Sequence, residues 1–488
     1  MGNRPEAALG QEVRDGWIFV SLLVLLVWAP LPLGSNRTWA IGLLLGFGVV
    51  LLTGTVLAWR RHVNEALDRL SLFRWPLGLL LFVVVLSWAQ TVALPAAWVE
   101  AISPMAAAAQ APAETMTLSL DVFQSRIMAS LSFVYFMVFM VVVLTVRQAH
   151  RLERLAQVLV FSGVLQAALG AVLFSMKAEY RIFFVQVAHT RTIGSFVYHN
   201  SLAAYLCMCL AIGIGLMLAR LGSKRVVYAG WRARTVAAIA FTLSAKMRLR
   251  LMLVVMVIAL VLTRSRMGNA AFFTAMVVVG LVAIALARKT APQTILLIAS
   301  LVVVDVLVVG TWVGLEKVVE RIQETELTVA DGGKSESVEA RTEAARAALP
   351  IVRDFPWVGT GGGSFYNVFL SYRTPTYGYA YVDHTHNDFV EIATDYGLLG
   401  LGALGLLVGL TLKTVVSVLA KRKSSLPWGM AFGVAMAVVA LLVHSTVDFN
   451  LQIPANALTI VVILAMGWIA HALPSPRSAP RSLKEPVV

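Results

Sequence analysis

Apolar runs long enough to cross a lipid bilayer recur along almost the whole chain of 488 residues. A helix needs about twenty mostly apolar residues to span the hydrocarbon layer, and its backbone hydrogen bonds are then all satisfied internally. Hydrophobic residues make up 59% of the sequence and charged residues only 14%, whereas charged residues are about a quarter of a soluble domain. The sequence therefore predicts an all-α polytopic membrane protein.

We expect about twelve transmembrane helices. They lie near residues 17–34, 38–58, 75–94, 125–146, 155–175, 200–220, 247–263, 268–287, 292–313, 397–418, 427–444 and 456–472. These positions divide the chain into a core of nine spans (1–313), a large loop (314–396), three further spans (397–473) and a short tail (474–488). Residues 235–250 either belong to a span or form a helix that lies along the membrane surface.

Lysine and arginine collect in the loops that follow every second predicted span, for example in residues 59–74, 147–154 and 219–234. Short cytoplasmic loops of membrane proteins carry this excess of positive charge. We therefore expect both termini in the cytoplasm and the loop 314–396 on the outer side of the membrane. The same loops account for the net charge of +14, so membrane lipids are expected partners and nucleic acid is not.

The loop 314–396 is too long to be a simple connection, and such loops are usually functional. It contains two predicted helices, "LEKVVERIQETEL" and "VEARTEAARAALPIV", the second ending in a kink at Pro350. At 100° per residue, Arg341 shares the apolar face of the second helix with Ala345 and Ala348. A guanidinium that points into the protein needs an anion. Either an internal salt bridge or a phosphate-bearing ligand meets this need.

The stretch "YVDHTHNDFVEIATDYGLLGLG" places His384 and His386 directly before an apolar helix. That helix is predicted to begin at Asn387 or Asp388, with Asp388 and Glu391 at the spacing of a capping box. The positive end of the helix dipole disfavours an imidazolium, so the pKa of His386 is expected at or below its ordinary value of about 6.5. A neutral His386 can accept a proton from a substrate. The alternative is a histidine that only hydrogen-bonds the loop.

The spacing His384-x-His386-x-Asp388 is also typical of a hydrolytic metal site. No second cluster of metal-binding residues occurs on the outer side of the predicted membrane, and no Asp-x-Asp pair is present. We therefore expect neither a metal nor a cofactor. The glycine-rich residues 359–364 lack the Lys-Ser/Thr ending of a nucleotide-binding loop and are predicted to form a tight turn, or alternatively a turn whose amides face an anion.

Two arginines, Arg264 and Arg266, stand between two spans on the predicted outer side, where positive residues are rare. They either extend their charged ends to the membrane surface or bind an anion. Arg191 is a further candidate of the same kind. His199, His444 and Asp448 lie near the outer ends of spans, where polar groups are expected to face protein or a cavity.

These residues together resemble the bacterial O-antigen ligase and O-antigen polymerase superfamily. The resemblance rests on His386-Asn387, nine residues, Gly397, two residues and Gly400. The blocks "TRSRMG", "RTEAARAALPIVRDFPWVGTGGGSF" and "HSTVDFNLQIPANAL" occur in the family's order around that motif. The resemblance covers most of the chain, most strongly from Arg191 to Asn456.

The resemblance implies a GT-C-like, metal-independent, inverting glycosyltransferase in the bacterial inner membrane. Such enzymes move a glycan from undecaprenyl pyrophosphate to an acceptor hydroxyl on the periplasmic side. His386 resembles the base that activates the acceptor, with Asn387, Asp388 and Gly397 in support. His384 departs from the family's pattern as an extra histidine beside the motif, and we expect it to support the site as well. Arg266 and Arg341 resemble the arginines that hold the donor pyrophosphate, and Arg191 and Arg264 are further matches.

The family includes ligases that use lipid A-core as acceptor, polymerases that extend a growing O-antigen or exopolysaccharide, and enzymes that glycosylate proteins. The histidine motif does not separate them, and we favour a ligase. An anion transporter is the alternative of a different class, because transporters also place arginine and histidine in polar cavities. Transporter sites usually lie in broken helices near the membrane midplane and between paired repeats, whereas this chain shows no repeat.

Overall fold

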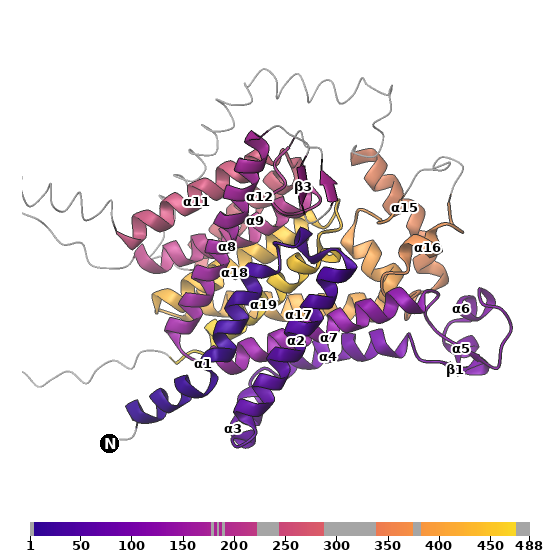
Figure 1. The fold of residues 1–488 in the computed structure, drawn as a ribbon, viewed down its shortest axis with the longest axis horizontal. Coiled ribbons are helices and arrows are strands. Elements are labelled where there is room, and N and C mark those ends of the chain that lie inside the picture. The colour runs from indigo at the N-terminus through magenta and orange to yellow at the C-terminus, as the bar shows by residue number, and fades with distance from the viewer. Residues whose placement is uncertain are drawn as a thin grey trace, which may run out of the picture.

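The computed structural model describes residues 4–176, 180–182, 185–187, 191–221, 244–286, 338–373 and 382–474 as a bundle of helices with two short antiparallel strand pairs (Figure 1). The first half consists of α1 (Arg4–Trp28), η1 (Leu33–Ser35), α2 (Thr38–Trp59), α3 (Val63–Ser71), α4 (Arg74–Ala89), β1 (Leu94–Pro95), α5 (Ala96–Ile102), α6 (Pro104–Ala108), β2 (Thr115–Met116), α7 (Val122–Thr145) and α8 (Ala149–Ser175). The second half consists of β3 (Tyr180–Ile182), β4 (Val185–Val187), α9 (His199–Leu221), α11 (Ala245–Leu262), α12 (Arg266–Leu286), α15 (Val338–Asp354), α16 (Phe365–Phe369), α17 (Asp388–Lys421), α18 (Ser425–His444), η4 (Asn450–Gln452) and α19 (Pro454–Ala472).

Eight helices of the described residues are long and apolar enough to cross a membrane, and the bent pair of α3 and α4 adds a ninth candidate. The eight are α2, α7, α8, α9, α12, α17, α18 and α19. Helices α1 and α11 also lie where spans are expected. The chain is therefore an all-α, multi-pass membrane protein. The expected span 292–313 and the first predicted helix of the large loop lie outside the described residues, so a total of about twelve stays a prediction.

Several bounds of the predicted helices differ from the structure, among them those of α1, α4, α15 and α17. Helix α15 does not end at Pro350 but continues to Asp354. Helix α11 begins at Ala245, so the last residues of the ambiguous range 235–250 belong to a long apolar helix, and residues 235–243 lie outside the described part of the chain.

Helix α9 forms the centre of the bundle and packs closely against α18 (Figure 1). Glycines make this close approach feasible: a Cβ atom on Gly215 would lie 2.3 Å from the carbonyl oxygen of Gly429, and one on Gly433 would lie 2.7 Å from that of Ala211. Small residues at helix crossings allow backbones in a membrane to approach in this way. The pair places the first residue of α9, His199, and the last residue of α18, His444, within one bundle.

Loops that the charge pattern assigns to the outer side meet at one end of the bundle. The backbone N–H of Leu120, before α7, donates to the carbonyl of Thr360 at 2.9 Å. The N–H of Thr192, before α9, donates to Leu262 at the end of α11, 3.3 Å away. The N–H of Asp388 donates to Ser445, which follows α18, at 3.0 Å. The segments that carry the predicted site therefore converge in space.

Helix α17 is interrupted at Gly397, and the loop after α15 docks against this break. The backbone of Gly397 has φ 65° and ψ −173°, a conformation that essentially only glycine adopts. The N–H groups of Leu398 and Leu399 donate to the carbonyls of Pro356 and Trp357 at 2.7 and 3.2 Å. The break therefore joins the chain that follows α15 to the first turns of α17.

The glycine-rich turn completes this attachment through backbone amides. The N–H of Gly363 donates to the carboxylate of Asp395 at 2.8 Å, and the N–H groups of Thr360 and Gly361 donate to the carbonyls of Thr394 and Asp395. The predicted tight turn is confirmed. The alternative of a turn whose amides bind a ligand anion is wrong for Gly363, because the carboxylate that it faces belongs to the chain itself.

Replacing Gly397 by alanine is expected to destabilise the protein by about 3 kcal/mol or more. A Cβ atom there would lie 2.2 Å from the carbonyl oxygen of Trp357, in addition to the unfavourable φ. Gly402→Ala, in the same helix with nothing within 4 Å of its added Cβ, is the matched control and should stabilise by roughly 0.5–1 kcal/mol. Thermal unfolding of both purified variants in detergent measures the difference, and equal midpoints would contradict the structural role of the break.

Candidate active site

His386 lies in the segment directly before α17, in a left-handed backbone conformation with φ 52°. Few residues other than glycine adopt this conformation, although histidine, asparagine and aspartate do so more often than most. The next residue, Asn387, is the N-cap of α17: its side-chain oxygen accepts hydrogen bonds from the N–H groups of Phe389 and Val390 at 3.0 and 3.2 Å. Its amide also donates to the carbonyl of Thr446 at 2.9 Å. The segment that carries His386 is therefore tied to the loop between α18 and α19.

The predicted capping box of Asp388 and Glu391 is wrong, although the predicted start of the helix is confirmed. The Asp388 carboxylate accepts hydrogen bonds from the Ser445 hydroxyl and from the N–H of Leu451, at 2.5 and 3.0 Å. The Glu391 carboxylate instead pairs with Nδ1 of His384 at 2.5 Å. Asn387 caps the helix, so both carboxylates are free to hold other segments of the site.

Phe449, in the loop between α18 and α19, brings the two histidines together. The ring of His384 stacks on it with centroids 4.1 Å apart, and the ring of His386 meets it edge-on at 5.1 Å. Tyr198 stacks on the same phenylalanine at 5.8 Å. Four aromatic side chains from three separate segments therefore share one centre.

The two histidines differ in charge. Burial, together with the nearby Arg341 and His384, lowers the pKa of His386 to about 4. Burial also disfavours the charged form of His384, but the carboxylate of Glu391 outweighs it and raises the pKa of His384 to about 9. The expected direction for His386 is confirmed, with burial as its largest cause instead of the helix dipole. At neutral pH, His386 is the neutral imidazole and His384 is an imidazolium.

Arg341 of α15 points into the protein, as its helical face predicts. It is 8% exposed, and one terminal nitrogen donates to the hydroxyl of Tyr198 at 2.7 Å. The other terminal nitrogen lies 3.4 Å from the carboxylate of Asp448 and from the carbonyl of Val447. Its Nε is buried and has no hydrogen-bond partner among the described residues. The predicted internal salt bridge therefore exists but is long, and it leaves part of the guanidinium available to an anion.

Asp448 is buried beside this arginine. Burial raises its pKa to about 6 even though the neighbouring Arg341 favours the ionised carboxylate. Its carboxylate also lies 3.8 Å from the ring of His444, a buried histidine at the end of α18. The aspartate is thus charged at neutral pH and loses its charge as the pH falls through about 6.

Arg191 joins the same group of residues from the segment before α9. A terminal nitrogen of its guanidinium lies 2.9 Å from Nε2 of His199, and the ring of His199 contacts that of Tyr198 at 4.7 Å between centroids. Tyr198 in turn accepts the hydrogen bond from Arg341. Arg191, His199, Tyr198 and Arg341 therefore form a continuous polar chain.

Arg264 and Arg266 lie at the same end of the bundle but outside this chain. Both are exposed, and within the described residues neither side chain makes a hydrogen bond or an ion pair. Ser265 between them is buried and caps the start of α12 by accepting from the N–H of Gly268 at 3.1 Å. The backbone bond from Thr192 to Leu262 places these arginines next to the Arg191 segment. The structure brings together His384, His386, Arg341 and Arg191, and leaves Arg264 and Arg266 at the surface nearby.

The metal-site spacing His384-x-His386-x-Asp388 does not converge in space. His384 faces Glu391, whereas Asp388 faces Ser445 and Leu451. Among the residues that the structure describes, no group of three or more histidine, cysteine, aspartate or glutamate side chains is arranged to hold a metal ion.

Sequence reasoning missed two aromatic residues, Tyr198 and Phe449, which connect the polar groups. Each directly adjoins a residue that the sequence did single out, because Tyr198 precedes His199 and Phe449 follows Asp448. An aromatic neighbour is too common in an apolar sequence to have identified them.

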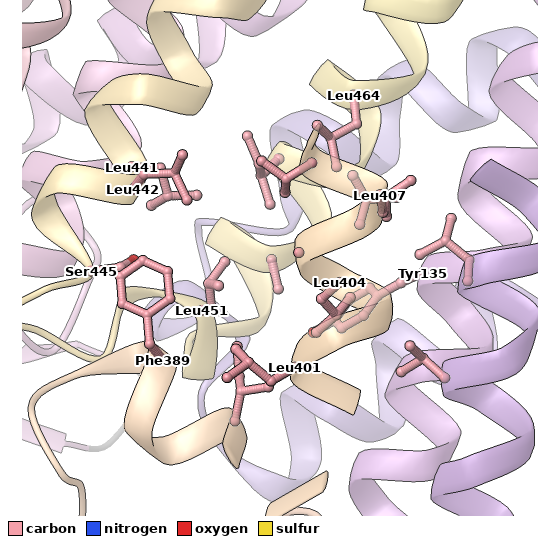
Figure 2. A pocket seen from close by; sticks show the side chains of 18 of the residues that line it. Tyr135, Phe389, Leu401, Leu404, Leu407, Leu441, Leu442, Ser445, Leu451 and Leu464 are labelled. Carbon is pink, nitrogen blue, oxygen red and sulfur yellow. The ribbon is translucent and has the colours of Figure 1, made fainter. Parts of the chain in front are cut away.

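An apolar cavity of about 420 Å³ lies next to these residues, between α4, α7, α17, α18 and α19 (Figure 2). Phe389, Ser445 and Leu451 border it on the side of α17 where the helix begins. The rest of its wall consists mainly of leucine, valine and isoleucine side chains, with Tyr135 among them. The charged residues and the apolar cavity therefore both adjoin the first turn of α17. This arrangement fits a ligand with a polar head and an apolar chain.

Residues 251–405 match a family model described as O-antigen ligase. The matched region runs from α11 to the middle of α17 and so includes Arg264, Arg266, Arg341 and both histidines. No curated protein matches the chain.

Imidazole NMR of the histidine-labelled protein is expected to show that His386 titrates well below neutral pH and His384 well above it. Because pH 7 lies above the pKa of about 4, His386 should be neutral there, and because it lies below about 9, His384 should be protonated. The variants His384→Gln and His386→Gln assign the two signals. A signal from His386 that titrates near 6.5 would contradict the buried environment described above.

Proposed function

We propose that this chain transfers a glycan from undecaprenyl pyrophosphate to an acceptor hydroxyl, because residues 251–405 match the O-antigen ligase family model. The proposed acceptor is lipid A-core, which makes the protein an O-antigen ligase, and the proposed location is the periplasmic face of the bacterial inner membrane. A polymerase that extends a growing glycan from the same donor is the second candidate.

The neutral, buried imidazole of His386 beside the guanidinium of Arg341 is the observation that supports this proposal. A general base must be unprotonated at the working pH, and the lowered pKa of His386 meets that condition. Its Nδ1 is buried without a hydrogen-bond partner among the described residues, so no internal contact competes for that nitrogen. If His386 had only a structural role in the loop, both of its ring nitrogens would be expected to form hydrogen bonds with nearby residues.

In the proposed reaction, a ring nitrogen of His386 accepts the proton of the acceptor hydroxyl as its oxygen attacks the anomeric carbon of the donor sugar. The bond from that carbon to the diphosphate oxygen breaks, and undecaprenyl pyrophosphate departs with the electron pair. Attack opposite to the leaving group inverts the anomeric centre. The proton remains on the imidazole until the product leaves.

Arg341 is proposed to stabilise the negative charge that grows on the departing diphosphate. Its buried Nε and its long, 3.4 Å contact with Asp448 leave donors for phosphate oxygens. Arg191 extends the positive region through His199 and Tyr198. Arg264 and Arg266, exposed at the same end of the bundle, are proposed to meet the diphosphate from the surface. These cations supply the charge that a metal ion provides in other glycosyltransferases, so the proposed reaction is metal-independent.

The apolar cavity supports a substrate carried on a lipid. It starts at the first turn of α17, three residues after His386, and continues between membrane helices (Figure 2). A soluble sugar nucleotide has no group that would favour such a wall, whereas a polyprenyl chain gains free energy by burial against it.

His386→Ala is expected to lower glycan transfer by about 10²–10⁴-fold, because the acceptor hydroxyl then loses its base. The assay is attachment of glycan to the acceptor in membranes or by the purified protein with a polyprenyl-diphosphate-linked glycan. His471→Ala, an exposed histidine at the end of α19, is the matched control and should keep normal activity. Near-normal transfer by a correctly inserted His386→Ala protein would remove the proposed mechanism.

Arg341→Lys is expected to raise the KM for the lipid-linked donor and lower kcat together, because lysine keeps the charge but not the forked set of donors. Arg346→Lys tests the same change on the exposed side of α15 and should leave both constants unchanged. Steady-state kinetics over a range of donor concentrations separates the two effects. Normal donor kinetics in Arg341→Lys would show that the guanidinium does not bind the diphosphate.

The identity of the acceptor follows from the glycan that a deletion strain accumulates. Lipid A-core without attached polymer indicates a ligase, whereas single repeat units on the core indicate a polymerase. Either outcome is independent of which imidazole acts as the base.

A further inference from the structure

A second imidazole, that of His384, lies beside the proposed base and has no part in the proposed proton transfer. Its Nδ1 is 2.5 Å from one carboxylate oxygen of Glu391. The other oxygen of Glu391 accepts from the N–H of Thr385 at 3.0 Å and from its hydroxyl group at 3.2 Å. One buried carboxylate of α17 therefore holds two consecutive residues that directly precede His386.

The ring of His384 is held from a second side by Phe449. The two rings are nearly parallel, with an angle of 16° and centroids 4.1 Å apart. The edge of His386 meets the same phenylalanine at 5.1 Å. Glu391 thus holds the His384 ring by a hydrogen bond in the plane of the ring, and Phe449 holds it by stacking on its face. Because His386 contacts the same phenylalanine, its position depends on both contacts.

The backbone at His386 requires such support. A residue other than glycine in the left-handed region costs on the order of 1 kcal/mol or more, and it persists only where its surroundings determine the conformation. Thr385 and Asn387 on either side are held by bonds between the Thr385 hydroxyl and the N–H and carbonyl of Asn387, at 3.1 and 2.8 Å. Glu391 anchors this short turn to the helix that follows it.

We infer that His384, held by Glu391, is a positioning residue for the proposed reaction: it fixes the ring of His386 against Phe449. The inference rests on the proposed function, since it assigns a role relative to His386 as base. His384 itself does not act as the base, because Glu391 raises its pKa to about 9 and its imidazole is already protonated at neutral pH.

The charged groups around His384 come from every element that packs against it. Asp383 adjoins it in the same segment, Glu391 and Asp395 approach it from α17, and Asp448 approaches it from the loop after α18. His386 and Arg341 form the cationic side of the site. Burial lowers the pKa of His384, and Glu391, Asp383 and Asp395 raise it by more, while the His384 imidazolium lowers the pKa of His386. Removal of the imidazolium therefore shifts the protonation of His386 to higher pH.

The test compares kcat, KM and the acid limb of the pH–rate profile in His384→Gln and Glu391→Gln, each as full-length protein with a polyprenyl-diphosphate-linked glycan as donor. A base displaced by about 1 Å loses on the order of 10²-fold in rate, so we expect kcat to fall roughly 10- to 100-fold in each variant. The donor KM should change less than about twofold, because Arg341 is untouched. The acid limb should move to higher pH by about half a unit or more.

The double variant His384→Gln/Glu391→Gln distinguishes a pair from two independent residues. If the two act together, its kcat should be about equal to that of the more damaged single variant. His471→Gln is the control for the substitution itself. Multiplicative losses in the double variant, or an acid limb at the position of the unmodified protein, would overturn the inference.

Failure of the inference and failure of the proposed function give different results. Normal kcat and pH profile in His384→Gln, with an inactive His386→Ala, would remove the positioning role and leave the base in place. Activity in His386→Ala with none in His384→Gln would make His384 the base and overturn both. Unfolding of both His384→Gln and Glu391→Gln would show that the pair serves the fold alone, which also contradicts the inference.

Discussion

The arrangement of the site depends on the carboxylate of Asp388, which joins the first turn of α17 to the loop between α18 and α19. It accepts hydrogen bonds from Ser445 and Leu451, on the two sides of Asp448 and Phe449. The segment with His386 and the loop that meets Arg341 therefore cannot move independently. Polar bonds of this kind are well suited to the end of a membrane bundle, where helix packing alone leaves loop positions undetermined.

The imidazole of His386 stays neutral in this site mainly because it is buried. Arg341 and the His384 imidazolium act in the same direction and also oppose its protonation. The compensating carboxylates, Glu391 and Asp448, each lie closest to a cation and not to His386. One group of residues thus holds a neutral imidazole beside cations, which is the combination that the proposed reaction requires.

The sequence allowed the helical class, most helix positions and the inward face of Arg341 to be predicted, because apolar length and 100° periodicity are local properties. The start of α17 was predicted together with the capping-box spacing of Asp388 and Glu391, and it is correct although Asn387 is the N-cap. The roles of Asp388 and Glu391 were not predicted. The partners of Asp388 lie 57 and 63 residues away in the sequence, and Glu391 pairs with the imidazolium of His384 instead of capping the helix. Tyr198 and Phe449 contact the histidines and Arg341 only through tertiary packing, so no local pattern reveals them. The roles of His386, Arg341, Arg191, Arg264 and Arg266 in a reaction remain predictions.

The spacing from His386 to Gly397 has a mechanical explanation in this structure. Helix α15 carries Arg341 and ends at Asp354, and the chain that follows it docks within a few residues onto the break at Gly397. Two and a half turns before this break, α17 begins at Asp388, two residues after His386. A glycine at this position therefore fixes the distance between the helix of the arginine and the helix of the histidine. Any residue with a Cβ would push Trp357 away and shift α15 with it, so the relative position of Arg341 and His386 depends on a glycine that contacts neither side chain.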